Sequence, residues 1–270
     1  MNRAVETCRR LGIDGIVAIG GDGTFRGATE LTHFGVPCVG LPGTIDNDIT
    51  STDETIGFDT AMNTVTEMVD RLRDTCESHA RCNVVEVMGR GAGDIALNTA
   101  IASGATAVAI PECPFDEDAV IAKIKASKKL GKRNFIIIVS EGMGHDLGPN
   151  LTEKIEAVTG IETRFARLAH VVRGGTPTLR DRVLSSRMGE FAVEQLLMGR
   201  SDLVVCLRNN EIVATDINYA LVLDRMYKGK LKDGDLDRFT EEQIAEMRAF
   251  CEEKKVWLSA LYKTANDLSL

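Results

Sequence analysis

The sequence lacks several features that are typical of membrane proteins, secreted proteins or proteins stabilised by a structural metal ion. No apolar run approaches the roughly 20 residues that a helix needs to cross a bilayer. The charged, amphipathic start, Met1 to Arg10, does not resemble a signal peptide. The seven cysteines are scattered and form no CxxC pair: Cys8, Cys38, Cys76, Cys82, Cys113, Cys206 and Cys251. This pattern argues against a disulfide framework or a zinc site. It predicts reduced thiols in a cytoplasm and no membrane partner.

The sequence also has fewer basic residues than acidic ones. The 270 residues carry a formal net charge of −8, which disfavours a nucleic-acid partner because nucleic acids bind to basic faces. An acidic protein that binds phosphates must gather positive charge locally. Arginines are available for this along the later part of the chain: Arg71, Arg73, Arg81, Arg90, Arg164, Arg173, Arg180 and Arg182. For any one of them alone, a solvated surface position is the simpler interpretation.

The sequence contains no internal repeat, low-complexity tract or proline-rich linker. Short Val/Ile-rich runs instead alternate with amphipathic stretches. The apolar runs predict buried parallel strands at Gly15 to Ile19, Cys38 to Leu41, Asn83 to Val87, Ala107 to Ile110, Phe135 to Val139 and Leu203 to Leu207. Helices are predicted at Phe25 to Phe34, Thr60 to Arg73, Asp94 to Ser103, Glu117 to Leu130, Thr152 to Val158 and Val183 to Met198. The alternation predicts an α/β fold with doubly wound, mostly parallel, Rossmann-like sheets.

Both ends of the chain have helical patterns. Met1 to Leu11 has apolar residues at helical spacing and leads into the first predicted strand. Near the other end, Thr240 and Gln243 have the spacing of a capping box. The apolar residues that follow predict a long terminal helix: Ile244, Met247, Cys251, Leu258 and Leu261.

The first motif with chemical content is Gly20-Gly21-Asp22-Gly23-Thr24, between a predicted strand and a predicted helix. At this place in a parallel sheet, the helix offers free N–H groups to an anion. The glycines let phosphate oxygens approach the backbone, and Asp22 can hold Mg²⁺. The alternative is a tight turn in which Asp22 or Thr24 is only an N-cap. By itself the motif also resembles nicotinamide-nucleotide kinases and diacylglycerol-type lipid kinases.

The second motif is Pro42-Gly43-Thr44-Ile45-Asp46-Asn47-Asp48, which also follows a predicted strand. Two carboxylates two residues apart can divide their work, one as a base toward a hydroxyl and the other toward metal-bound water or phosphate. The alternative is an Asx-rich surface turn.

Together, the two motifs resemble the phosphofructokinase family and not the other two kinase classes. Further segments resemble the family in order and spacing: Arg71 to Asp74, Ser78 to Arg81, Glu86 to Arg90, Pro111-Glu112, Ser140 to Gly142, Glu162 to Arg164 and His170 to Gly175. The resemblance covers roughly Leu11 to Asp216. It implies a phosphofructokinase-like, two-lobed α/β fold and phosphoryl transfer from ATP, with Mg²⁺, to the C1 hydroxyl of fructose 6-phosphate.

The resemblance also implies roles for single residues in phosphoryl transfer. Asp46 would be the general base toward the C1 hydroxyl, Asp22 the magnesium ligand and Asp48 a second, supporting metal residue. The nucleotide phosphates would be wrapped by Gly21, Asp22, Gly23 and Thr24. Arg90, with Thr44 beside it, would stabilise charge on the phosphoryl group in flight.

For the sugar phosphate, the resemblance implies a larger set of residues. It consists of Thr44, Ile45, Asp46, Arg81, Met88, Gly89, Arg90, Glu141, Arg164, His170, Val171, Val172 and Arg173. Arg81 would reach in from a neighbouring subunit, which implies a homo-oligomer. On a strand, Arg164 and His170 share parity, so we expect them to point to one face. A lone histidine at a strand end is more often structural, but flanking arginines favour a phosphate pocket.

Two glycines bear on the phosphoryl donor. Gly23 and Gly43 resemble the ATP-using branch, since the pyrophosphate-using branch has Asp and Lys at these positions. The segment from Gly89 to Asp94 is similar to the GxGxxG pattern of dinucleotide-binding proteins. The pattern is incomplete, because its third glycine would stand where this sequence has Asp94.

The chain departs from the family in two respects. We expect it to lack the usual first strand and nucleotide loop, so a non-catalytic remnant that binds sugar phosphate or joins a full-length subunit is the alternative function. The effector-binding basic residues match at Arg73, Lys132 and Arg133, whereas Thr106 replaces an acidic residue. The expected organisation is an incomplete nucleotide-side lobe (1–57 plus 170–220), a sugar-phosphate-side lobe (58–169 plus 221–239) and a C-terminal helical extension (240–270).

Overall fold

The computed structural model describes residues 2–269 and divides the chain into two compact units. The first unit is formed by Met1–Gly57 and Pro177–Lys254, and the second by Phe58–Thr176 and Lys255–Leu270. The chain therefore leaves the first unit after Gly57 and returns to it at Pro177.

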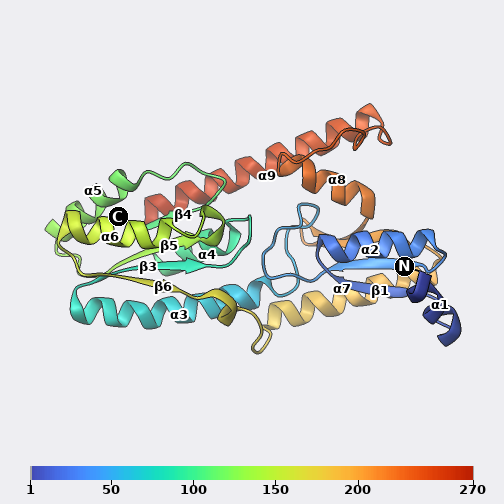
Figure 1. Ribbon diagram of the computed structural model, residues 1–270, viewed down its shortest axis with the longest axis horizontal. Coiled ribbons are helices and arrows are strands. Elements are labelled where there is room, and N and C mark those ends of the chain that lie inside the picture. Colours follow the sequence, from blue (N-terminus) through green and yellow to red (C-terminus); the bar gives the residue numbers. More distant parts are fainter. Residues whose placement is uncertain (1, 270) are drawn as a thin grey trace. The chain divides into compact units, whose positions relative to one another are not determined.

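The first unit is built on a four-stranded sheet of order β1-β2-β7-β8, of which Figure 1 labels β1. The strands are β1 (Ile16–Gly20), β2 (Cys38–Pro42), β7 (Leu203–Arg208) and β8 (Glu211–Asp216). The first three are parallel and β8 pairs antiparallel with β7. The helices of this unit are α1 (Asn2–Leu11), α2 (Asp22–His33), α7 (Leu179–Leu197), α8 (Ile217–Tyr227) and the first part of α9 (Glu241–Leu268).

Helices cover both faces of this sheet, so the side chains of β2 and most of those of β7 are buried on either side. Along β2, Cys38 belongs to a core shared with Phe25 of α2 and Ile217 of α8. Its neighbour Val39 belongs to a core shared with Met188 of α7. Successive side chains of a strand point to opposite faces, so α2 and α8 lie on one face and α7 lies on the other.

The second unit contains an entirely parallel sheet of order β4-β5-β3-β6. Its strands are β3 (Cys82–Val87), β4 (Ala107–Ala109), β5 (Phe135–Ser140) and β6 (Thr163–Arg167). The helices are α3 (Phe58–His79), α4 (Asp94–Ser103), α5 (Glu117–Lys129), α6 (Leu147–Thr159), the 3₁₀ turns η1 (Glu141–Met143) and η2 (Ala169–Val172), and the last part of α9. Every residue of β3 and β5 is buried, and Ile137 packs in one core with Leu151 of α6 and Ile124 of α5.

The predicted α/β class and the six predicted strands are confirmed, with bounds that differ by one residue. Two elements near residue 215 were not predicted, β8 and α8, because no glycine or proline separates them in the sequence. Residues 221–239 were expected in the sugar-phosphate-side lobe but lie in the first unit, since Leu221 packs with Phe25 of α2. The capping box of α9 is confirmed: the Gln243 N–H donates to Thr240 Oγ1 at 3.2 Å, and the Thr240 N–H donates to Gln243 Oε1 at 3.0 Å.

Two surface properties complete the description. No helix within residues 2–269 is both long and apolar enough to cross a membrane.

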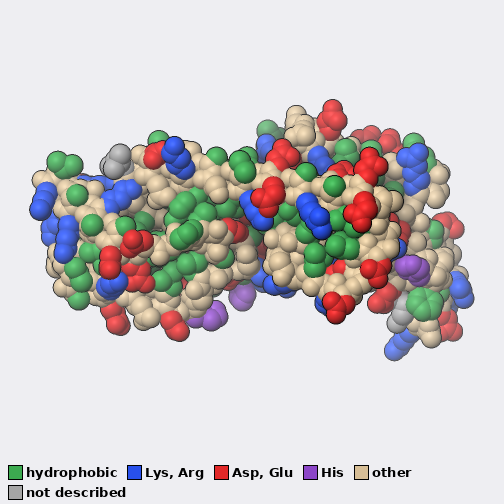
Figure 2. Space-filling view, turned by 90° about the horizontal axis from the view of Figure 1, so that it is seen from above, with side chains coloured by type: hydrophobic (Ala, Val, Ile, Leu, Met, Phe, Trp, Pro, Cys, Tyr) green, Lys and Arg blue, Asp and Glu red, His purple; other side chains and the backbone are tan. Residues whose placement is uncertain are grey.

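Figure 2 shows acidic side chains lying among the basic ones over most of the face drawn.

The core of the second unit can be tested at Leu151, which is fully buried in α6. We expect Leu151→Ala to lower the free energy of unfolding by about 2–5 kcal/mol, because it leaves a cavity beneath the sheet. Leu130→Ala is the control: Leu130 is 90% exposed, so its effect should stay within about 0.5 kcal/mol. Urea unfolding followed by the fluorescence of Trp257, the chain's one tryptophan, measures both, because Trp257 lies in this unit. Equal losses in the two variants would contradict the assigned core.

Candidate functional site

The glycine-rich motif lies where β1 ends and α2 begins. Gly21 is the N-cap of α2, with no side-chain cap, and Asp22 is in the first turn. The alternative in which Asp22 or Thr24 is the N-cap is therefore wrong. A Cβ at Gly20 would lie 2.2 Å from Thr24 Oγ1, whereas at Gly21 and Gly23 it would meet no atom within 4 Å. The packing of the turn requires only Gly20 to be glycine, while Gly21 and Gly23 leave the space in front of the helix open.

The acidic motif begins at the same edge of the same sheet. Gly20 pairs with Pro42 in the parallel register of β1 and β2, so both strands deliver their following loops to one edge. The chain after Pro42 then runs without helix or strand to Gly57, apart from an isolated bridge between Gly43 and Ile56.

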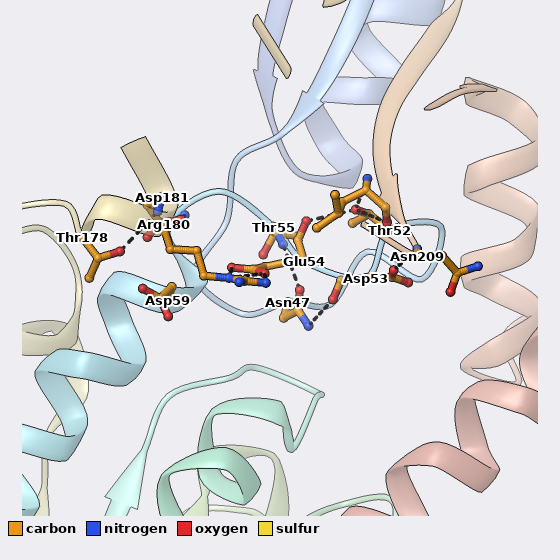
Figure 3. Close-up of polar contacts among 12 residues, drawn as sticks. Asn47, Thr52, Asp53, Glu54, Thr55, Asp59, Thr178, Arg180, Asp181 and Asn209 are labelled. Atoms are coloured by element: carbon orange, nitrogen blue, oxygen red, sulfur yellow. Dashed lines mark hydrogen bonds and ion pairs between the residues drawn. The ribbon is translucent and has the colours of Figure 1, made fainter. Parts of the chain in front are cut away.

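This irregular segment, residues 43–57, is mostly buried, and its polar groups bind one another (Figure 3). The Asn47 side chain donates to the Asp53 carbonyl at 3.3 Å and accepts from the Thr55 N–H at 3.0 Å. The Thr55 hydroxyl donates to the Thr44 carbonyl at 2.6 Å. The backbone N–H of Asp46 donates to Thr44 Oγ1 at 3.2 Å, and Asp46 itself is only 8% exposed. The segment is thus folded around the side chain of Asn47.

Elements from much later in the chain hold the outside of the segment. Arg180 of α7 binds both carboxylate oxygens of Glu54, with Nε at 2.7 Å from each. The Leu207 N–H of β7 donates to Thr52 Oγ1 at 2.9 Å. The Gly57 N–H donates to Asp181 Oδ1 at 2.7 Å. These contacts fix the segment to α7 and to β7 (Figure 3).

The electrostatics around Asp22 involve residues that the sequence analysis did not identify. Burial, followed by the nearby carboxylates of Asp224 and Asp48, raises the pKa of Asp22, while Lys228 acts in the opposite direction. The Lys228 Nζ lies 2.9 Å from Asp224 Oδ2 and 3.8 Å from Asp48 Oδ2. The spacing of Asp224 and Lys228, four residues apart, was visible in the sequence, but both fall within residues 221–239, which were expected in the sugar-phosphate-side lobe.

Within residues 2–269, no group of three or more His, Cys, Asp or Glu side chains is placed to hold a metal ion. The donors available at the edge of the first sheet are the carboxylates of Asp22 and Asp48. Mg²⁺ is commonly bound by one or two carboxylates together with substrate phosphates and water. The residues present therefore fit a magnesium ion that arrives with a nucleotide, and they do not form a complete protein cage.

In the second unit, Met88, Gly89 and Arg90 follow β3, and Glu141 follows the neighbouring β5. Glu141 Oε1 accepts from the backbone N–H of Gly89 at 3.2 Å and of Arg90 at 2.7 Å. Gly89 has φ +144, and a Cβ there would lie 2.5 Å from the Ala92 carbonyl. Glu141 thus orients the turn that presents Arg90.

Arg81 and Arg164 also lie in the second unit, where both contact Glu162. Arg81 Nε lies 2.6 Å from Glu162 Oε2, and an Arg164 guanidinium nitrogen contacts Oε1. The hydrogen bond from Arg81 lowers the pKa of this carboxyl. Glu162 was visible in the sequence as part of the motif Glu162 to Arg164, but no role was expected for it.

The two arginines lie at the opposite edge of the sheet from Met88–Arg90. Arg81 precedes β3, Arg164 is near the start of β6, and these strands are parallel, with Cys82 paired to Thr163. The first and last Cα atoms of the six-residue β3 are about 17 Å apart at ~3.3 Å per residue. One chain therefore does not bring Arg81 and Arg164 together with Arg90 and Glu141.

Arg164 and His170 do not lie on one strand, so the prediction that they point to one face of it is wrong. The strand ends at Arg167, and His170 lies in η2 with Val171 and Val172. Arg173 is the C-cap of this turn, and its N–H donates to the His170 carbonyl at 3.0 Å.

Of the candidate effector residues, Arg73 and Lys132 interact electrostatically. Arg73 donates to the Ser103 carbonyl. Burial, followed by the positive charge of Arg73, lowers the pKa of Lys132. Arg133 is exposed, and Thr106 is buried at the start of β4.

Comparisons with known proteins agree with one another. A family model described as Phosphofructokinase matches residues 1–196. An ATP-dependent 6-phosphofructokinase from Bacillus pumilus is 49% identical over 240 residues, covering 89% of this chain and 73% of the relative. That from Bacillus subtilis is 51% identical over 215 residues, covering 80% and 67%.

Solved structures give the same picture. The phosphofructokinase from Saccharomyces cerevisiae superposes with a TM-score of 0.78 at 30% identity, covering 92% of this chain. This chain spans 38% of the length of that yeast chain. A pyrophosphate-dependent phosphofructokinase from Nitrosospira multiformis has a TM-score of 0.72 at 20% identity, which shows the likeness of fold alone.

Asn47 provides a test of the irregular segment. Asn47→Ala removes the hydrogen bonds that the side chain makes with the Asp53 carbonyl and the Thr55 N–H, and it leaves the buried Thr55 N–H without this acceptor. We therefore expect the free energy of unfolding to fall by about 2–4 kcal/mol. Urea unfolding followed by circular dichroism measures this loss, and hydrogen exchange of residues 44–57 localises it.

Asn209→Ala is the matched control for the backbone. Asn209 has φ 50 and Asn47 has φ 52, so both replacements place alanine in the left-handed region. Asn209 is exposed, and it binds Asp53 Oδ2 through its backbone N–H. A loss in Asn209→Ala as large as that in Asn47→Ala would attribute the effect to the backbone conformation and not to the buried amide.

Proposed function

The chain belongs to the phosphofructokinase family, and from that premise we propose that it transfers a phosphoryl group from ATP to the C1 hydroxyl of fructose 6-phosphate. The product is fructose 1,6-bisphosphate, and the step belongs to glycolysis. The observation that carries the proposal is the convergence of two loops: Gly20–Thr24 and Gly43–Asp48 leave neighbouring parallel strands at one edge of the first sheet. Phosphoryl transfer needs positioning and charge neutralisation, and these loops offer both.

The first loop would bind the nucleotide. Gly21, Asp22, Gly23 and Thr24 lie at the start of α2, where free N–H groups favour phosphate oxygens. Asp22 would hold Mg²⁺, with Asp48 in support. When bound, the ion neutralises charge on the transferred phosphoryl group. The open space at Gly21 and Gly23 supports a ligand at this place.

The second loop would supply the base. Asp46 takes the proton from the C1 hydroxyl as the sugar oxygen attacks the phosphorus. Its low exposure and the hydrogen-bonded segment around it hold the carboxylate in one place. Thr44 and Arg90 stabilise the negative charge that develops during transfer.

ATP is the proposed donor. The relatives from two Bacillus species are named for ATP dependence. A Cβ at Gly43 would lie 2.7 Å from Ile19 Cγ2, so a lysine there, as in the pyrophosphate-using branch, would displace Ile19. At Gly23 there is no such neighbour within 4 Å, and the space that an aspartate side chain would fill is left to the nucleotide.

The sugar phosphate would be bound by residues of the second unit, namely Met88, Gly89, Arg90, Glu141, His170, Val171, Val172 and Arg173, together with Thr44, Ile45 and Asp46. Arg81, and with it Arg164, lies at the opposite edge of its sheet, so both would serve the site of a second copy. A homo-oligomer is therefore part of the proposal. We place the enzyme in the cytoplasm, with Arg73, Lys132 and Arg133 as the basic residues of an effector site.

The decisive test is a coupled assay of ADP production by the purified chain with ATP, Mg²⁺ and fructose 6-phosphate. We expect turnover. A folded sample that binds fructose 6-phosphate without turnover would support the non-catalytic alternative, a sugar-phosphate-binding chain.

Asp46→Asn tests the base. Removing it should lower kcat by about 10²–10⁴-fold, with the fold intact by circular dichroism. Asp53→Asn is the control, because Asp53 is an exposed carboxylate in the same segment. Unchanged turnover in Asp46→Asn would remove Asp46 from the mechanism.

A further inference from the structure

We propose that Lys228, held by Asp224, is a positioning residue for Asp48 and for the loop that presents Asp46. The inference rests on the proposed function, because it gives the α8 pair a role at the edge where nucleotide and magnesium would bind. Neither residue touches the reacting atoms in this proposal, and both act through the acidic loop.

The geometry places one ammonium group on two parts of Asp48. Lys228 Nζ donates to the backbone carbonyl of Asp48 at 2.7 Å and lies 3.8 Å from its carboxylate oxygen Oδ2. The same nitrogen lies 2.9 Å from Asp224 Oδ2. The Lys228 side chain is 25% exposed, so these interactions are only partly weakened by solvent. Lys228 therefore restrains both the backbone and the side chain of Asp48.

Asp224 fixes the lysine from the helix side. It is 3% exposed and one turn before Lys228 in α8. Its Oδ1 accepts from the Thr50 hydroxyl at 2.7 Å and from the Thr50 N–H at 3.3 Å. A buried carboxylate requires such partners, because an unpaired one is costly. Asp224 and Lys228 thus bracket Ile49, with Lys228 on Asp48 and Asp224 on Thr50.

A purely structural tie between α8 and the acidic segment would need only the bonds of Asp224 to Thr50. Lys228 adds a positive charge between Asp48 and Asp224, and it acts on Asp22 as well. Without that charge, three carboxylates would face one another at this edge, and Asp48 would move away from its neighbours. In the proposal, the ammonium holds the Asp48 carboxylate where it acts on Asp22, in the first turn of α2.

The test compares three variants of the full chain: Lys228→Met, which removes the charge; Lys228→Arg, which keeps it; and Lys230→Met, the control. Lys230 is exposed two residues further along. The probe is Mn²⁺ with ADP, measured by electron paramagnetic resonance of free Mn²⁺. Hydrogen exchange of residues 44–50 is measured on the same samples.

We expect Lys228→Met to weaken Mn²⁺ binding about 10–100-fold, as for residues that orient metal ligands, and to speed exchange in residues 44–50. Where turnover is measurable, kcat should fall while KM for fructose 6-phosphate stays near that of the wild type. Lys228→Arg should recover most of the affinity, and Lys230→Met should match the wild type.

The outcomes separate the two proposals. Failure of the wild-type chain to bind Mn²⁺ with ADP would overturn the proposed function, and this inference with it. Wild-type binding together with unchanged binding by a folded Lys228→Met would overturn the inference alone. So would faster exchange without a change in Mn²⁺ affinity, since Lys228 would then be only structural. Lys228→Gln keeps a donor for the Asp48 carbonyl; if Lys228→Met does not fold, it should show the same loss, and unchanged binding by it would refute the proposal.

Discussion

The first unit depends on one constraint: a long segment without helix or strand is buried, so its backbone groups must find partners elsewhere. Residues 43–57 have no ladder of their own beyond the bridge at Gly43 and Ile56. Buried backbone N–H and C=O groups are nearly always paired. Side chains provide much of the pairing here: Asn47 inside the segment accepts from the Thr55 N–H, and Asp181 and Asp224 outside it accept from the N–H groups of Gly57 and Thr50.

This constraint explains why the first unit needs the late part of the chain. The partners of the segment include Arg180 and Asp181 in α7, Leu207 in β7 and Asp224 in α8, all more than 120 residues away in sequence. The sheet edge alone would leave the acidic loop exposed and mobile. With these partners in place, the carboxylates of Asp46 and Asp48 have fixed surroundings, and fixed surroundings are what an acid–base or metal-binding group requires.

The sequence was sufficient for features that depend on local pattern. Strand β5 is an apolar run up to Val139, and β3 is apolar apart from Asn83 and Glu86; both are buried on both faces, so their prediction needed no knowledge of their partners. The glycine-rich and acidic loops were placed correctly because each directly follows such a run. Tertiary pairing was not readable: the contact of Glu162 with Arg81 and the contacts of Lys228 with Asp48 join residues that are distant in sequence. The position of Arg164 was misjudged for a related reason, since parity gives the face of a strand but not the edge of the sheet.

The edge of the parallel sheet at which a residue lies determines which other residues can bind the same ligand with it. In a parallel sheet all strands run in one direction, so residues before the strands and residues after them lie at opposite edges, separated by the strand length. Arg81 and Arg164 lie before and at the starts of β3 and β6, while Arg90 and Glu141 lie after the ends of β3 and β5. At about 17 Å across β3, arginine side chains at one edge do not reach a phosphate bound at the other. On the proposed function, the positive charge for one sugar phosphate therefore comes partly from another copy of the chain. Assembly is then a condition for substrate binding and not an addition to a site that is already complete.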